Sequence, residues 1–171
     1  DIVDAEADRA HPVKRTRPIA SGRVPLGLAK VMAVVLVVVA LAGSIPGGGW
    51  FVLVTCLYFG QNIAYSFGLK KLAYVDVGII AAGFVLRVLA GGFATKTPLS
   101  GFMIACTALL ALFLGFGKRR HELATAVNAK KQRAALGAYT PRALNVALGL
   151  TGAAAVATYL AYTLDQHTRA F

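Results

Sequence analysis

The chain has 171 residues, of which 57% are hydrophobic and only 15% charged, and its mean hydropathy is +0.66. A soluble domain of this length is typically about 45–50% apolar and about 25% charged, so the composition indicates an all-α integral membrane protein. The formal net charge of +11 does not indicate nucleic-acid binding, because the basic residues are concentrated in loops between apolar runs.

Five apolar runs approach the ~20 residues that a helix needs to cross a bilayer. We expect the spans at about 26–45, 50–67, 77–94, 99–116 and 143–164. Gly and Ala are frequent within them, which allows close helix packing in lipid. Because no low-complexity linker separates the runs, residues 1–171 are expected to form a single polytopic transmembrane helical bundle.

Three segments, residues 1–30, 68–76 and 117–142, hold fifteen of the eighteen Lys and Arg residues. They alternate along the series of predicted spans and therefore lie on one side of the membrane. The positive-inside rule makes that side cytoplasmic. We expect a protein of the plasma membrane whose charged loops face the cytoplasm.

The opening segment reads DIVDAEADRAHPVKRTRPIASG. On a helix, Asp1, Asp4 and Asp8 would fall within an arc of roughly 60°. Carboxylates this close repel one another unless a cation lies between them, and Mg²⁺ prefers such oxygen ligands together with substrate phosphates. The basic residues that follow suit phosphate binding: Arg9, Lys14, Arg15, Arg17 and Arg23. The segment predicts a metal–diphosphate site at the membrane surface, and the alternative is a solvated charged loop.

The second segment, YSFGLKKLAYVD, lies between two predicted spans and combines basic, acidic and aromatic residues. Lys70 is suited to bind a phosphate, and Asp76 to support a metal or a basic partner. Lys and Tyr at a helix end are also ordinary interfacial anchors, an alternative that holds for Lys71 and Tyr74.

The third segment begins GFGKRRHELA, where Gly117 is expected to let the chain leave the membrane. Lys118 and Arg119 suit phosphate binding, and Glu122 can orient one cation by ion pairing. Arg87 is the one charge well inside a predicted span. Such a residue usually faces a polar cavity, where it contacts a phosphate or pairs with backbone or an acid from another helix.

At these motifs the sequence resembles the UbiA superfamily of intramembrane prenyltransferases, and most closely the branch that transfers phosphoribose to decaprenyl phosphate. The motifs that carry the resemblance are DIVDAEADRAHPVKRTRPIASG, YSFGLKKLAYVD, GFVLRVLAGGFATKTPLS and FGKRRHEL, followed by AYT near Tyr139, in the family's order. Members have nine transmembrane helices around a central cavity. The chain therefore looks like a fragment with about five of the nine.

The resemblance implies a glycosyltransferase, more narrowly a pentosyltransferase. It would move 5-phosphoribose from phosphoribosyl pyrophosphate to a polyprenyl phosphate, with Mg²⁺ as cofactor and diphosphate as the leaving group. The product would supply arabinan, and hence arabinogalactan, of a cell wall. The family suggests a homo-oligomer in the lipid bilayer, with a trimer as the specific candidate.

The resemblance also assigns roles to individual residues of this chain. The catalytic residues are Asp1 and Asp4, and the metal ligands are Asp1, Asp4 and Asp8. The ligands of the donor phosphates are Lys14, Arg17, Lys118 and Arg119, and those of the acceptor phosphate are Lys70 and Arg87. The supporting residues are Tyr65, Asp76 and Glu122.

Two other functions are considered. A prenyltransferase with an aromatic acceptor would usually carry paired aspartates in a second motif, whereas this chain offers Asp76 beside Lys70 and Lys71. Cations suit an anionic acceptor better than a neutral ring, which favours phosphoribosyl transfer. A non-catalytic polytopic membrane protein would explain the spans, but not the three acids in helical register.

Overall fold

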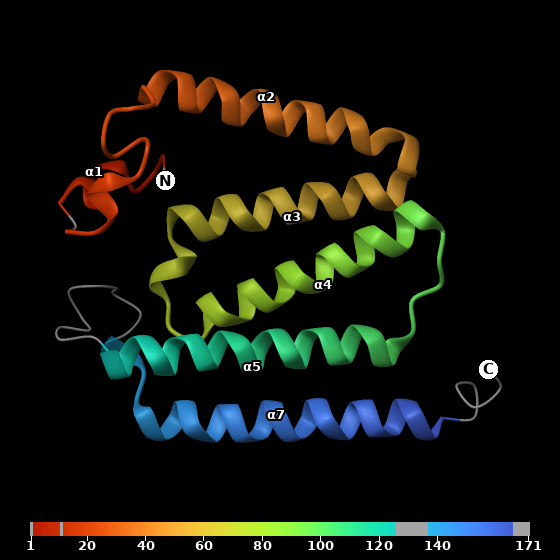
Figure 1. Ribbon diagram of the computed structural model, residues 1–171. Helices are drawn as coiled ribbons and strands as arrows, with labels where there is room; N and C mark the ends of the chain where they lie inside the picture. The colour runs from red at the N-terminus through yellow and green to blue at the C-terminus, as the bar shows by residue number, and fades with distance from the viewer. Residues whose placement is uncertain (1, 11, 126–136, 166–171) are drawn as a thin grey trace. The chain divides into compact units, whose positions relative to one another are not determined.

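The computed structural model describes residues 2–10, 12–125 and 137–165, which form helices joined by turns (Figure 1). The chain divides into two compact units, residues 1–52 and residues 53–171.

The described part of the first unit contains three short helical segments and one complete long helix. Helix α1 (Ala5–Arg9) and the 3₁₀ turn η1 (Lys14–Thr16) precede α2 (Leu26–Ser44). The turn η2 (Ile45–Gly47) follows α2 and contains Pro46, whose missing N–H disfavours further α-helix. Gly48 follows at φ 89°, a conformation that glycine adopts without steric cost, and the chain then enters the next helix.

The second unit contains most of α3 (Gly49–Phe67), then α4 (Val75–Thr95), α5 (Gly101–Thr125) and α7 (Pro141–Leu164). Helix α5 lies beside both α4 and α7 (Figure 1). The α4–α5 contact is close, because a Cβ atom placed on Gly115 would lie 2.6 Å from Cγ1 of Val77. The glycine thus allows two helices to approach where lipid supplies no hydrophobic driving force.

All five apolar runs predicted from the sequence are helical. Among the described residues, four helices are long and apolar enough to cross a membrane: Leu26–Gly47, Val75–Thr95, Gly101–Thr125 and Pro141–Leu164. Helix α3, which covers the span predicted at 50–67, is not one of these four. The physical reason is that α3 carries Gln61 and Asn62 in its second half, which lower its hydropathy.

The largest boundary error concerns the end of α5. The sequence predicted that the helix ends near residue 116, but it continues past Gly117 to Thr125. Residues 118–125 include good helix formers, and Arg119 pairs with Glu122 one turn further along, which stabilises the extension. The run of three cations therefore lies on a helix and not in a loop.

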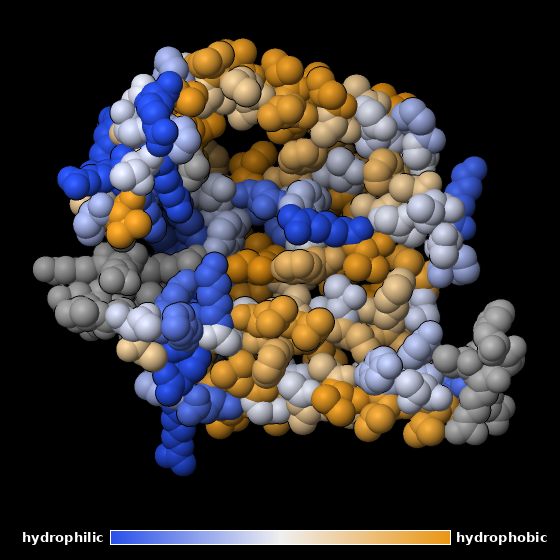
Figure 2. All heavy atoms as spheres, viewed as in Figure 1, coloured by the Kyte–Doolittle hydropathy of each residue, from blue (hydrophilic) through white to orange (hydrophobic). Residues whose placement is uncertain are grey.

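Hydrophobic surface follows the length of α5 and α7, and hydrophilic residues gather where α5 ends and α7 begins (Figure 2). With the four apolar helices, this distribution makes the chain an integral membrane protein. At the same end of the second unit, Val77, Tyr139 and Leu144 form a small buried core. Thr140 caps α7 by accepting the N–H of Ala143 at 3.2 Å.

Candidate functional site

The opening segment places two of its three predicted metal ligands one helical turn apart. Helix α1 begins at Ala5, so Asp4 is its N-cap residue, and the N–H of Asp8 donates to the carbonyl of Asp4 at 2.8 Å. Asp1 lies outside the described residues. The helix is therefore shorter than the sequence predicted, because only five residues have helical hydrogen bonding.

A predicted metal ligand and a predicted phosphate ligand meet in this unit. The Asp8 side chain is only 6% exposed, and its Oδ2 lies 2.9 Å from Nη1 of Arg17. A buried carboxylate needs such a partner, because an uncompensated charge is costly to remove from water. The chemistry of Asp4 and Asp8 fits Mg²⁺, which takes carboxylate and phosphate oxygens. Within the described residues, no three acidic, histidine or cysteine side chains gather closely enough to hold a metal.

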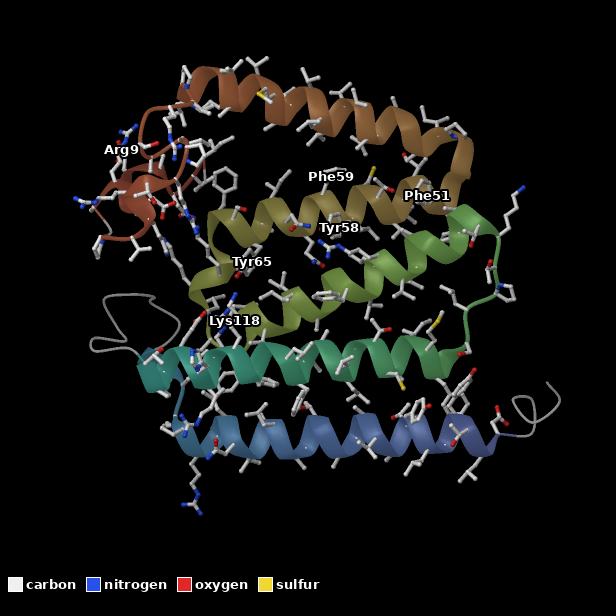
Figure 3. All side chains as sticks on the ribbon, in the orientation of Figure 1. Arg9, Phe51, Tyr58, Phe59, Tyr65 and Lys118 are labelled. Carbon is white, nitrogen blue, oxygen red and sulfur yellow. The ribbon has the colours of Figure 1, made fainter. Side chains whose placement is uncertain are left out.

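Two other basic residues of the opening segment stabilise its backbone. Arg9 donates from Nε to the carbonyl of Ala20 at 3.3 Å, and Arg23 donates from Nη2 to the carbonyl of Thr16 at 2.7 Å (Arg9 is labelled in Figure 3). These bonds fold the loop back on itself. Lys14, a predicted donor ligand, lies in the 3₁₀ turn within that loop.

In the second unit, the predicted supporting residues form a buried ionic cluster. The side chains of Arg119 and Asp76 are 1% and 0% exposed, and Nε of Arg119 lies 3.3 Å from Oδ2 of Asp76. Arg119 also pairs with Glu122. Two buried opposite charges compensate each other's desolvation, so removing either one would be costly. The structure thus directs Arg119 into the protein, whereas the sequence had grouped it with phosphate ligands.

Tyr139 completes this cluster and was not identified from the sequence as a site residue. Its hydroxyl donates to Oδ1 of Asp76 at 2.6 Å and accepts the backbone N–H of Tyr74 at 2.7 Å. Burial, and then the hydrogen bond to Asp76, raise the pKa of Tyr139 above its ordinary value of 10.0, so the phenol keeps its proton to a higher pH than an exposed tyrosine does. In the sequence this region was marked by the AYT triplet of the resemblance, and Thr140 and Pro141, which follow Tyr139, are a helix-start signal.

The other two cations of the run have different surroundings. Lys118 is exposed near the end of α5 (Figure 3), and it is therefore available to a ligand from solution. Arg120 donates from Nε to Oδ1 of Asn145 on α7 at 3.0 Å.

Arg87 borders a cavity of about 190 Å³ between α3 and α4. Its guanidinium donates to the Tyr58 hydroxyl, at 3.1 Å from Nε, and lies 5.1 Å and 5.5 Å from the ring centres of Tyr58 and Phe84. These aromatic faces stabilise the cation. The cavity is lined by Tyr58, Gln61, Asn62, Tyr65, Ile79, Ile80, Gly83, Phe84 and Arg87 (Tyr58 and Tyr65 are labelled in Figure 3).

The cavity thus brings two predicted site residues, Tyr65 and Arg87, to one place. Gln61 and Asn62, the polar residues in the second half of α3, line this cavity. Gln61 also donates a hydrogen bond to the Ile79 carbonyl of α4 at 2.9 Å. Lys70, the other predicted acceptor ligand, precedes α4, whereas Arg87 lies twelve residues beyond Val75, or about 18 Å along the helix axis. The two cations therefore occupy different depths.

Apolar helices of membrane-spanning length, with cationic and acidic clusters at their ends, define a polytopic membrane protein. The family model described as the UbiA prenyltransferase family matches residues 1–164, and the chain belongs to this family.

The chain is similar to two proteins named decaprenyl-phosphate phosphoribosyltransferase. The identity is 41% over 160 residues for Mycobacterium tuberculosis, covering 93% of this chain and 53% of the relative. For Corynebacterium glutamicum it is 36% over 173 residues, covering 98% and 52%. A digeranylgeranylglyceryl phosphate synthase of Sulfolobus acidocaldarius is 35% identical over 107 residues, covering 61% and 37%. The chain thus spans about half the length of the first two relatives.

Proposed function

We propose that the protein containing this chain transfers 5-phosphoribose from phosphoribosyl pyrophosphate to a polyprenyl phosphate such as decaprenyl phosphate. The observation that carries the proposal is the similarity of more than nine-tenths of the chain to two relatives named decaprenyl-phosphate phosphoribosyltransferase. The cations of the two charged segments in the second unit agree with it, because both substrates are anionic.

The proposed reaction breaks the bond between C1 of the ribose and the diphosphate oxygen, and forms a bond from C1 to a phosphate oxygen of the acceptor. Diphosphate leaves with the bonding electron pair. The acceptor phosphate is already ionised near neutral pH, so no strong general base is required. The task of the protein is to hold and orient two anions and to exclude water from the ribose carbon.

We assign Lys14, Arg17 and Lys118 to the phosphates of the donor. Lys118 is exposed, whereas Arg119 is buried and paired with Asp76 and Glu122, which supports a structural role for Arg119. We assign Lys70 and Arg87 to the acceptor, with Lys70 at the loop and Arg87 deeper in the cavity.

Asp1, Asp4 and Asp8 are the residues that would hold Mg²⁺ in this proposal. When bound, the ion would neutralise charge on the departing diphosphate. Arg17, which pairs with Asp8, would connect the metal ligands to the donor phosphates.

The setting of the protein is part of the same proposal. We assign it to the plasma membrane with its charged loops in the cytoplasm, on the positive-inside rule. A phosphoribosylated lipid of this kind would serve as a precursor for cell-wall arabinan, and the active protein would be a homo-oligomer.

The test is a transfer assay with the full-length protein reconstituted in vesicles. Radiolabelled phosphoribosyl pyrophosphate is offered with polyprenyl phosphate, with and without Mg²⁺, and labelled prenyl diphosphate is offered with hydroxybenzoate in parallel. We expect label in the phosphoribosyl lipid only, and only with Mg²⁺. Label found only in a prenylated hydroxybenzoate would overturn the proposal.

A matched pair of variants tests the metal assignment in the same assay. Asp4→Asn should abolish the Mg²⁺-dependent binding of phosphoribosyl pyrophosphate, because it removes a carboxylate from the proposed ligand set. Glu6→Gln, an exposed acid on the same short helix, should leave that binding unchanged. Unchanged binding in Asp4→Asn would refute the assignment.

A further inference from the structure

The backbone turns sharply at Tyr74, immediately before α4. Tyr74 has φ 65° and ψ −40°, and the N–H of Val75 donates to the carbonyl of Ala73 at 2.8 Å. A hydrogen bond between residues two apart, closed around a residue with positive φ, is a classic γ-turn. This turn is rare and strained, and a bulky residue such as tyrosine makes it more so.

One hydroxyl group holds this strained turn from a distant part of the chain. The N–H of Tyr74 donates to the hydroxyl of Tyr139 at 2.7 Å, and the two rings pack with their centres 4.7 Å apart. Tyr139 is 4% exposed, and its hydroxyl is oriented because it donates to Asp76 at 2.6 Å.

The orientation of Asp76 is fixed in turn by buried groups. Its Oδ1 also accepts the N–H of Val77 at 2.9 Å, and its Oδ2 lies 3.3 Å from Nε of Arg119. Two hydrogen bonds at Oδ1 and the ion pair at Oδ2 together restrain this buried carboxylate. The Tyr139 hydroxyl is therefore a rigid acceptor for Tyr74.

The γ-turn sets the direction in which the preceding loop enters α4. That loop contains the 3₁₀ turn η3 (Leu69–Lys71), and it is joined to α4 by the N–H of Asp76, which donates to the carbonyl of Leu72 at 3.1 Å. Lys70 and Lys71 lie in η3. Backbone strain that the surroundings maintain is found most often at functional positions, which directs attention to this loop.

We infer that Tyr139 is a positioning residue, whose hydroxyl holds the γ-turn at Tyr74 and thereby fixes where Lys70 meets the phosphate of the acceptor. This inference rests on the proposed function, in which Lys70 binds that phosphate. In this role Tyr139 acts through the backbone of Tyr74. Its role differs from simple packing, because packing needs the ring and positioning needs the hydroxyl.

The test uses Tyr139→Phe in the full-length protein, which keeps the ring and removes the hydroxyl. We expect the KM for polyprenyl phosphate to rise about tenfold, while kcat and the KM for phosphoribosyl pyrophosphate change less than about twofold. Amide hydrogen exchange over residues 68–76 should become faster. Tyr159→Phe, which removes an exposed hydroxyl on α7, should change none of these quantities. An unchanged acceptor KM, or an equal rise in both KM values, would overturn the inference.

A second variant separates strain relief from general loss of stability. Tyr74→Gly relieves the γ-turn, because glycine adopts positive φ without steric cost. In that background Tyr139→Phe should change the acceptor KM less than about twofold, and a persisting tenfold effect would overturn the inference. If the wild-type protein transfers no phosphoribose, the proposed function fails, and the exchange rates of residues 68–76 still decide the role of the hydroxyl.

Discussion

Replacing Arg119 by methionine tests whether this cation is structural or binds substrate. Arg119→Met would remove the ion pair that Arg119 makes with Asp76, which is 0% exposed. Removing one member of a buried ion pair typically costs about 3–5 kcal/mol, which corresponds to roughly 10²- to 10⁴-fold in the unfolding equilibrium. Lys118→Met is the matched control, because the neighbouring side chain is exposed, and its effect on stability should stay within about 0.5 kcal/mol.

The assay is reversible unfolding of the full-length protein in mixed detergent micelles, combined with binding of phosphoribosyl pyrophosphate. Arg119→Met should be strongly destabilised, whereas Lys118→Met should fold normally and bind the donor more weakly. Adding Asp76→Asn to Arg119→Met should restore part of the lost stability, because the buried charge is then absent. If Arg119→Met cost less than about 1 kcal/mol and weakened donor binding as much as Lys118→Met, the structural role would be refuted.

Two further predictions concern stability. Because the folded state raises the pKa of Tyr139, the unfolded chain ionises near pH 10.0 before the folded one does, so wild-type stability should fall as pH rises above 10. Tyr139→Phe should lack this part of the decline in pH-dependent unfolding measurements, and identical slopes would contradict the prediction. Gly115→Ala should be about 1–3 kcal/mol less stable than the control variant Gly117→Ala. The Cβ added at position 115 would lie 2.6 Å from Val77, whereas the Cβ added at position 117 would lie 3.8 Å from Leu148. Equal stabilities of the two variants in the same unfolding assay would contradict this prediction.

The apolar runs predicted the helices well, because burial of backbone polar groups in lipid leaves helix as the available structure. The polar segments were harder to assign. The length of α5 was underestimated because Gly117 and the charges after it were interpreted as a loop, while helix propensity and the pair of Arg119 with Glu122 continue the helix.

The buried cluster could be predicted only in part. Asp76 and Glu122 were predicted to be supporting residues, and the structure gives both of them the same ionic partner, Arg119. Tyr139 could not be connected to them, because it lies 63 residues from Asp76 in the sequence. Local periodicity does not reveal contacts between residues so far apart in the chain. Nor does composition distinguish Arg119 from Lys118, since adjacent cations differ only through the neighbours that the fold supplies.

The extension of α5 has a geometric consequence for its three consecutive cations. Successive residues of an α-helix project about 100° apart, so a run of three cannot form one electrostatic surface. Lys118 is exposed, Arg119 lies against Asp76 of α4, and Arg120 contacts Asn145 of α7. The three cations of one helical turn therefore face water, α4 and α7, respectively. Substitutions at these adjacent positions should consequently produce different kinds of defect.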